Sequence, residues 1–178
     1  MLPEQAQPVA VSHVNQPVSV THVRGLYLIS GVCGLVDAVC FLSLGEVFAE
    51  MMTGNLLLIM FHLGSGLPLT AYAANAIAVV TFLLGAIIAG RIVRGPYGHT
   101  RFGFFCEWGF LALAVVMSLT LPLETSQLAR FAVISTLAYA MGMQNALMRR
   151  HGVPDLATNV MTLTLTALLA DSVLAGGT

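Results

Sequence analysis

The chain alternates between long apolar runs and short polar breaks, and the long runs have the length of membrane-spanning helices. A helix needs about 20 residues to cross a hydrocarbon core. Runs of this length cover residues 25–44, 69–90, 102–121, 128–148 and 156–174. A shorter run at 48–63 carries Gly54 in its interior and ends in the turn-forming stretch "GSGLP". The pattern predicts an all-α fold, a polytopic transmembrane helical bundle, in which Gly54 breaks the short run.

The composition agrees with this prediction. Of the 178 residues, 57% are hydrophobic and 8% are charged, whereas a soluble domain carries about a quarter charged residues. The formal net charge is −1 and no lysine occurs, so the chain has no basic stripe that would bind nucleic acid. Residues 1–23 are polar and contain Pro and Gln. They are predicted to be a disordered tail, followed by a single transmembrane domain over residues 24–178.

The arginines predict the orientation of the bundle. Three of them fall in the short loop 91–101 and two in the loop 149–155, while the short connection "PLETSQ" at 122–127 carries Glu124 and no basic residue. Because cytoplasmic loops carry an excess of arginine, we expect both arginine loops in the cytoplasm and Glu124 outside. The side of the N-terminus stays open. The tail is outside if the run at 48–63 crosses the membrane, and inside if that run is re-entrant.

Two polar stretches, at 34–59 and 142–169, are similar to each other in the order of their residues. Each has a span with a polar residue near its end, Asp37 in the first and Gln144 with Asn145 in the second. Each then has a turn with Gly, Val and an acid, and enters an apolar segment through Met-Thr. Internal repeats of this kind occur in many transporter folds. The order predicts two related halves containing short or broken polar helices.

The same two stretches carry a family resemblance. The run "GLVDAVCFLSLGEVFAEMMTGN", followed by "AMGMQNALMRRHGVPDLATNVMTLTLT", resembles the YoaK family of bacterial integral membrane proteins, a domain of unknown function. The resemblance covers about residues 25 to 174 and implies a multi-pass helical protein of the bacterial inner membrane. Members usually continue with at least one more hydrophobic segment, whereas this chain ends at "DSVLAGGT". We therefore expect a shortened form or a missing final span.

Asp37 is the sharpest candidate for a functional residue. A carboxylate near the centre of a membrane helix costs about 2.5–3.5 kcal/mol on insertion scales. It is therefore expected either to bind a solute or proton, or to cap or hydrogen-bond a neighbouring helix. Two alternatives of equal weight stay open for the stretch Thr53, Gly54 and Asn55. They coordinate a solute at an unwound backbone, or they form a helix-packing notch in which Asn55 bonds to another helix.

The second stretch adds further polar side chains. Thr158, Thr162 and Thr166 repeat every four residues, with Asn159 beside the first. Helical spacing puts the threonines in one stripe, which either lines a cavity or bonds back to its own helix. Gln144 and Asn145 are expected to pair with Asp37 or its helix. The hypothesis is that these residues and the first stretch form the two halves of one substrate-binding site.

Several other polar residues carry weaker signals. Glu107 lies beside Trp108 and near an arginine loop, and is expected to be interfacial. Glu46 and Glu50 are a weak signal for a cation. Cys33, like the other two cysteines, is expected to be a small buried apolar residue. The cysteines form no CxxC motif, and the nine methionines are read as packing residues, so we expect no metal and no cofactor.

Two classes of function remain. The favoured one is a small-solute transporter or permease, because broken polar segments within an apolar bundle are where such sites lie. The alternative is a membrane-embedded enzyme or a non-transporting accessory subunit. A Ser-His-Asp order, a HExxH motif and a P-loop do not occur in the sequence, which disfavours an enzyme. The expected partners are membrane lipids and a small solute, and self-association into a homo-oligomer stays open.

Overall fold

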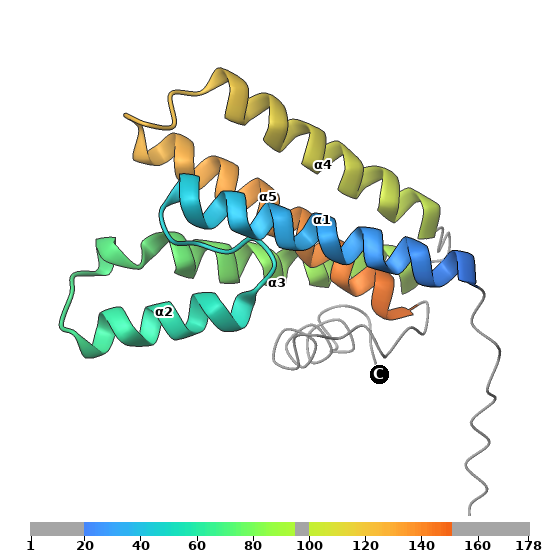
Figure 1. Ribbon diagram of the computed structural model, residues 1–178, viewed down its shortest axis with the longest axis horizontal. Helices are drawn as coiled ribbons and strands as arrows, with labels where there is room; N and C mark the ends of the chain where they lie inside the picture. Colours follow the sequence, from blue (N-terminus) through green and yellow to red (C-terminus); the bar gives the residue numbers. More distant parts are fainter. Residues whose placement is uncertain (1–19, 95–99, 151–178) are drawn as a thin grey trace, which may run out of the picture.

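The structure is a computed structural model, and it describes residues 20–94 and 100–150. Its elements are α1 (Val20–Leu44), α2 (Met52–Gly64), the short 3-10 helix η1 (Leu69–Ala71), α3 (Ala73–Arg94), α4 (Thr100–Thr120) and α5 (Gln127–Arg150). These elements are helical throughout, which confirms the predicted all-α class (Figure 1). The predicted span 156–174, with Thr158, Asn159, Thr162 and Thr166, lies outside the described residues.

The helices follow the apolar runs closely. Three stretches are long and apolar enough to cross a membrane by length and composition: Ala73–Arg94, Arg101–Thr120 and Gln127–Arg149. The first predicted span lies within α1, which has 25 residues. This helix begins at Val20, so the last residues of the range predicted as a disordered tail belong to it, and residues 1–19 lie outside the described part.

The centre of the bundle is a close crossing of α3 and α5 through two glycines. A Cβ added at Gly85 would clash with the carbonyl of Tyr139, and one at Gly142 would clash with the carbonyl of Phe82. Small residues allow helix backbones to approach in this way. Ala138, four residues before Gly142 on the same face of α5, is fully buried. The crossing makes α3 and α5 the scaffold on which the other helices pack.

The charged residues separate to the two ends of the bundle. The start of α1, the C-terminal ends of α3 and α5 and the start of α4 lie at one end (Figure 1). That end carries Arg91, Arg94, Arg101 and Arg149, all exposed. The opposite end carries the α4–α5 connection with the exposed Glu124. The fold thus separates these four arginines from Glu124 as expected, while the side that each end faces stays a prediction.

Residues 45–51, the return segment, turn back from the end of α1 towards the middle of that helix. The backbone of Gly45 (φ 100°) and Glu46 (φ 54°) is left-handed, and the Glu46 N–H donates to the Phe41 carbonyl at 3.1 Å, which closes the helix end. The segment then reaches Asp37, whose carboxylate binds it 12 to 14 residues along the chain. Since Asp37 lies seven residues before Leu44, this depth is about 10 Å from the end of α1.

The short helix α2 starts at that depth and runs out again. Its 13 residues span about 20 Å, which is less than the about 30 Å of a hydrocarbon core. It ends at the same end of the bundle as α1 (Figure 1), so the run predicted at 48–63 enters and leaves at one end of the bundle. This is the geometry of the re-entrant alternative. The expectation that Gly54 breaks the run is wrong, because Gly54 lies within α2 and the break precedes Met52.

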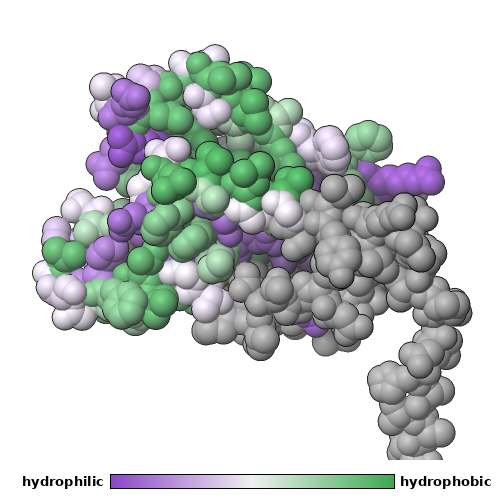
Figure 2. All heavy atoms as spheres, in the orientation of Figure 1, coloured by the Kyte–Doolittle hydropathy of each residue, from purple (hydrophilic) through white to green (hydrophobic). Residues whose placement is uncertain are grey.

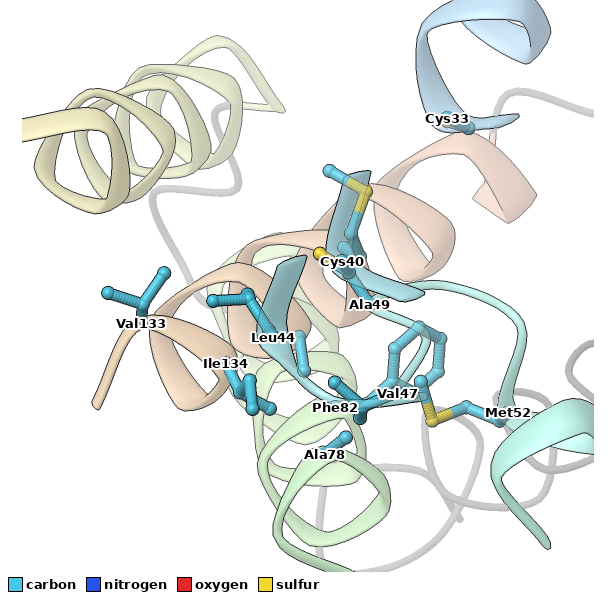
Figure 3. Packing of buried hydrophobic residues seen from close by; sticks show 12 residues of the cluster. Cys33, Cys40, Leu44, Val47, Ala49, Met52, Ala78, Phe82, Val133 and Ile134 are labelled. Atoms are coloured by element: carbon cyan, nitrogen blue, oxygen red, sulfur yellow. The ribbon is translucent and has the colours of Figure 1, made fainter. Parts of the chain in front are cut away.

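The return segment is packed as part of the core. Val47, Ala49 and Met52 are buried in one cluster with Leu44 and Phe82, and Figure 3 shows these side chains meeting between α1, α3 and α5. The exposed side of the bundle is apolar instead. Hydrophobic residues cover most of α1 and α4 in Figure 2, including the exposed Val32, Leu35, Leu42, Phe105, Trp108, Leu113 and Leu119. An exposed apolar surface of this extent is typical of contact with lipid.

Candidate functional site

Asp37 holds the return segment by its backbone. The Asp37 carboxylate accepts the N–H groups of Ala49 at 2.7 Å, Glu50 at 2.8 Å and Met51 at 3.0 Å. Non-helical backbone inside an apolar bundle must find such partners, because each unpaired N–H costs free energy. The carboxylate also lies against the N-terminus of α2, where the helix dipole favours a negative charge. Asp37, 8% exposed, therefore spends its carboxylate on the backbone just before α2, which is close to the hydrogen-bonding alternative among its two expected roles.

Asn55 and Asn75 complete the support of the segment. The Asn55 side chain, fully buried, accepts the Phe48 N–H at 2.9 Å and donates to the Phe48 carbonyl at 2.8 Å. Asn75 of α3 donates to the Glu46 carbonyl at 2.9 Å and to Asn55 Oδ1 at 3.2 Å. The return segment is thus bound by side chains from α1, α2 and α3. Asn55 bonds across to another helix, as the packing alternative expected.

Gly54 serves the packing of the same segment. A Cβ at this position would lie 2.8 Å from two ring carbons of Phe48 and 3.3 Å from the sulfur of Met51. The Phe48 ring in turn stacks on Phe41 of α1, with the ring centroids 5.0 Å apart. The glycine therefore makes room for an aromatic side chain of the return segment. Thr53 lies beside it in the first turn of α2 and is half-buried.

Gln144 and Asn145 join the segment to α5. The Asn145 amide lies 3.3 Å from Glu50 Oε1 and also donates to the Met141 carbonyl at 3.1 Å. The Gln144 Oε1 lies 3.7 Å from the Cys33 sulfur of α1. Gln144 therefore pairs with the helix of Asp37, as expected, while Asn145 contacts the return segment.

Glu107 of α4 points into the bundle. Only 3% of it is exposed, and its Oε2 has no hydrogen-bond partner, whereas its neighbour Trp108 is 71% exposed. The expectation that Glu107 is interfacial is therefore wrong. One residue corresponds to about 100° of helix rotation, so Trp108 faces outwards while Glu107 faces α5.

We call five residues from four parts of the chain the polar layer: Cys33, Glu50, Glu107, Gln144 and Asn145. Cys33 contacts Gln144 and Asn145 contacts Glu50, while Glu107 lies on α4, which packs against α5. Of the residues predicted for a substrate site, Asp37 and Asn55 both bind the return segment. Asn145 contacts it through Glu50, and Gln144 contacts Cys33 of α1. The predicted substrate site also includes residues outside the described part of the chain, and their contribution stays a prediction: Thr158, Asn159, Thr162 and Thr166.

Sequence reasoning missed Asn75 and gave Cys33 no polar role. Asn75 lies in an apolar run and makes two of the bonds that hold the return segment. Asn75 could have been found in the same way as Asp37, because a polar side chain within a membrane span needs a hydrogen-bond partner. Within the part of the chain that the structure describes, no three His, Cys, Asp or Glu side chains form a group that could hold a metal ion.

These features define a helical membrane protein with a half-length helix anchored inside its bundle. The model of the family described as Protein of unknown function (DUF1275) matches residues 25–176, and the chain belongs to this family. It is similar to the UPF0700 transmembrane protein YoaK of Bacillus subtilis (strain 168), with 28% identity over 148 residues, or 82% of this chain and 65% of that protein. The chain therefore spans less than two thirds of this relative. No solved structure matches it.

Proposed function

We propose that this protein is a small-solute transporter or permease and that the polar layer is its solute site. The observation that carries the proposal is the buried Glu107 carboxyl with one unpaired oxygen. Ionisable groups inside membrane bundles are costly, and they mark substrate and ion pathways by default. A bundle selected for stability alone gains nothing from this group.

The depth of the layer supports the proposal. Cys33 lies 11 residues before the end of α1 at Leu44, which corresponds to about 16 Å along the helix. A hydrocarbon core is about 30 Å thick, so the layer lies near its middle. Transporter sites lie near the midplane, next to helices that are interrupted there. Here the interruption is the return segment, and its Glu50 side chain belongs to the layer.

The hydrogen bonds of the described residues also divide into two groups. Asp37, Asn55 and Asn75 spend their capacity on the backbone of the return segment, so they act as its support. Glu107, in contrast, keeps a buried oxygen without a hydrogen-bond partner. A solute can therefore bind in the layer without dismantling the segment that shapes it.

Water access to the layer tests the proposal first. In a chain whose three cysteines are replaced by alanine, Asn145→Cys should react with a small, charged, membrane-impermeant thiol reagent. The matched control Leu113→Cys, on the exposed apolar face of α4, should stay unreactive because it contacts lipid.

Flux is the second measurement. The chain in proteoliposomes is offered isotopically labelled amino acids, polyamines, urea, sugars and alkali metal ions, with protein-free liposomes as reference. We expect uptake of one class of solute, reduced at least about tenfold by Asn145→Leu, which removes a polar anchor. The exposed Glu124→Gln should leave uptake unchanged. A layer closed to the reagent from both sides, together with no uptake, would contradict the proposal and favour the accessory class.

A further inference from the structure

The carboxyl of Glu107 lies inside the contact between α4 and α5. On one side of it, a Cβ at Gly103 would lie 2.7 Å from Leu147. On the other side, Phe110 packs edge-on against Tyr139, with ring centroids 4.7 Å apart. Glu107 lies four residues after Gly103 and three before Phe110, so the three positions share one face of α4. Because this face meets α5 at both flanking contacts, Glu107 is turned towards α5 as well, and only 3% of it is exposed.

The helices packed on α4 bring no opposite charge to this carboxyl. Its Oε2 has no hydrogen-bond partner, so none of the donors of the polar layer is bonded to it. On α5, the level between Tyr139 and Leu147 holds Met143, 1% exposed, and the titratable side chain on that face is the Tyr139 phenol. On α4 itself the neighbouring titratable group is the Cys106 thiol. The described arginines of α3, α4 and α5 lie at the helix ends: Arg91, Arg94, Arg101 and Arg149 are exposed at one end, and Arg130 donates to backbone carbonyls at the other.

Asp37 shows what a charged carboxyl receives in the same bundle. Its carboxylate, 8% exposed, accepts three backbone N–H groups at 2.7, 2.8 and 3.0 Å. Such bonds replace the water that a charge loses on burial. Glu107 is less exposed than Asp37, and one of its two oxygens has no partner. A carboxyl in this position avoids the cost of a buried charge by keeping its proton.

We propose that Glu107 is a proton-binding site, at which the folded chain holds the neutral carboxylic acid. The proton leaves when water or a solute reaches the contact between α4 and α5 and stabilises the carboxylate. Ionisable side chains inside membrane bundles form the proton relays of pumps and transporters. The inference rests on the proposed function where it makes the proton the ion that is coupled to solute movement, whereas binding of the proton does not depend on transport.

Infrared spectroscopy of the purified chain in detergent detects the proton directly. A protonated carboxylic acid has a C=O stretching band that a carboxylate lacks. At neutral pH the exposed Asp and Glu side chains are ionised, so a band that persists there belongs to a carboxyl whose surroundings keep it neutral. We expect this band in the parent chain and its loss in Glu107→Gln, which keeps the shape of the side chain and removes the acid.

Two further variants make the assignment specific. Glu107→Asp keeps the acid on a shorter side chain, so it should move the band, and it serves on its own if Glu107→Gln does not fold. Glu124→Gln, exposed in the α4–α5 connection, should leave the band as it is in the parent. Absence of the band from the parent chain, or a band that neither Glu107→Gln nor Glu107→Asp changes, overturns the inference.

Proteoliposomes separate this inference from the proposed function. We expect a proton gradient directed into the vesicles to raise the uptake of the transported solute several-fold with the parent chain, and Glu107→Gln to abolish this increase. Uptake that the gradient does not change, in the parent and the variant alike, would remove the coupling and keep the transporter. The infrared band of Glu107 without uptake of any solute would keep the proton site and remove transport.

Discussion

Asn145 of α5 donates its side-chain amide to the carboxylate of Glu50, with 3.3 Å between Nδ2 and Oε1. The N–H of the same Glu50 is bound by Asp37 of α1 at 2.8 Å. Glu50 is therefore held on two sides, through its backbone by α1 and through its side chain by α5. Any change that moves the return segment must displace a side chain of the polar layer, so the support of the segment and the proposed solute site are mechanically linked.

Asp37→Asn is expected to weaken the fold less than Asp37→Leu. Asparagine keeps one acceptor oxygen for the N–H groups of Ala49 and Glu50, but turns an amide donor towards the Met51 N–H. One unsatisfied buried donor costs about 1–3 kcal/mol, and leucine leaves all three unsatisfied. Thermal unfolding in detergent and abundance in the membrane measure the difference. Equal losses for the two variants, or none for either, would mean that the three hydrogen bonds do not support the segment.

Asn55 and Asn75 are expected to act as one unit. Asn75 donates to Asn55 Oδ1 at 3.2 Å, and both bind the return segment. The double variant Asn55→Ala with Asn75→Ala should therefore lose less stability than the sum of the single losses, with an interaction energy of about 0.5–3 kcal/mol. The control cycle pairs Asn55→Ala with Ser118→Ala, which is exposed in α4 and should be additive. Additivity in both cycles would show that the Asn55–Asn75 contact carries no energy.

Gly54→Ala is expected to destabilise the chain through Phe48. Its Cβ would lie 2.8 Å from the Phe48 ring, and overpacking of this kind costs about 1–3 kcal/mol. Phe48→Leu should recover part of that loss, because a smaller side chain leaves room for the Cβ. Gly64→Ala is the matched control in the same helix, where a Cβ would meet nothing within 4 Å. A loss in Gly54→Ala that Phe48→Leu does not reduce would point to backbone freedom at Gly54 instead.

The sequence predicted the helices well because apolar run length alone defines them. It misplaced the break because residues 48–51 are compatible with a helix, and they leave that conformation only where Asp37, Asn55 and Asn75 supply partners for their backbone. Those partners come from three helices, so local pattern cannot reveal them. The position of a carboxylate within a predicted span singled out Asp37 as costly, but could not choose between a hydrogen bond to a neighbouring helix and a solute site.

Glu107 shows a different limit. Its position near Trp108 and the arginine loop favoured the interface, and the neighbour does lie on the outer face. The rotation of α4 about its axis decides which of the two residues faces lipid, and that rotation is set by Gly103 and Phe110 packing on α5. The sequence therefore predicts how far along a helix a residue lies better than it predicts the rotation of that helix about its axis.

The re-entrant path of α2 predicts which ends of the bundle are accessible from outside the cell. In a chain without its native cysteines, single cysteines replace Thr21 at the start of α1, Gly98 in the arginine loop, Ser65 after α2, and Ser126 between α4 and α5. Because arginine-rich ends stay in the cytoplasm, we expect an impermeant thiol reagent to label Ser65→Cys and Ser126→Cys in intact cells. Thr21→Cys and Gly98→Cys should react only after permeabilisation.

The result at Ser65 and Thr21 together decides the path. If α1 and α2 both crossed the membrane, the chain would return to its starting side, and Thr21 and Ser65 would lie on the same side. If α2 is re-entrant, only α1 crosses, and the two residues lie on opposite sides. Labelling of Thr21→Cys and Ser65→Cys from the same side would therefore contradict the re-entrant path. Labelling of Gly98→Cys from outside, with Ser126→Cys protected, would keep the path and reverse the orientation. We do not expect labelling of Thr21→Cys and Ser65→Cys from the same side, because α2 is about 20 Å long and starts at the return segment inside the bundle.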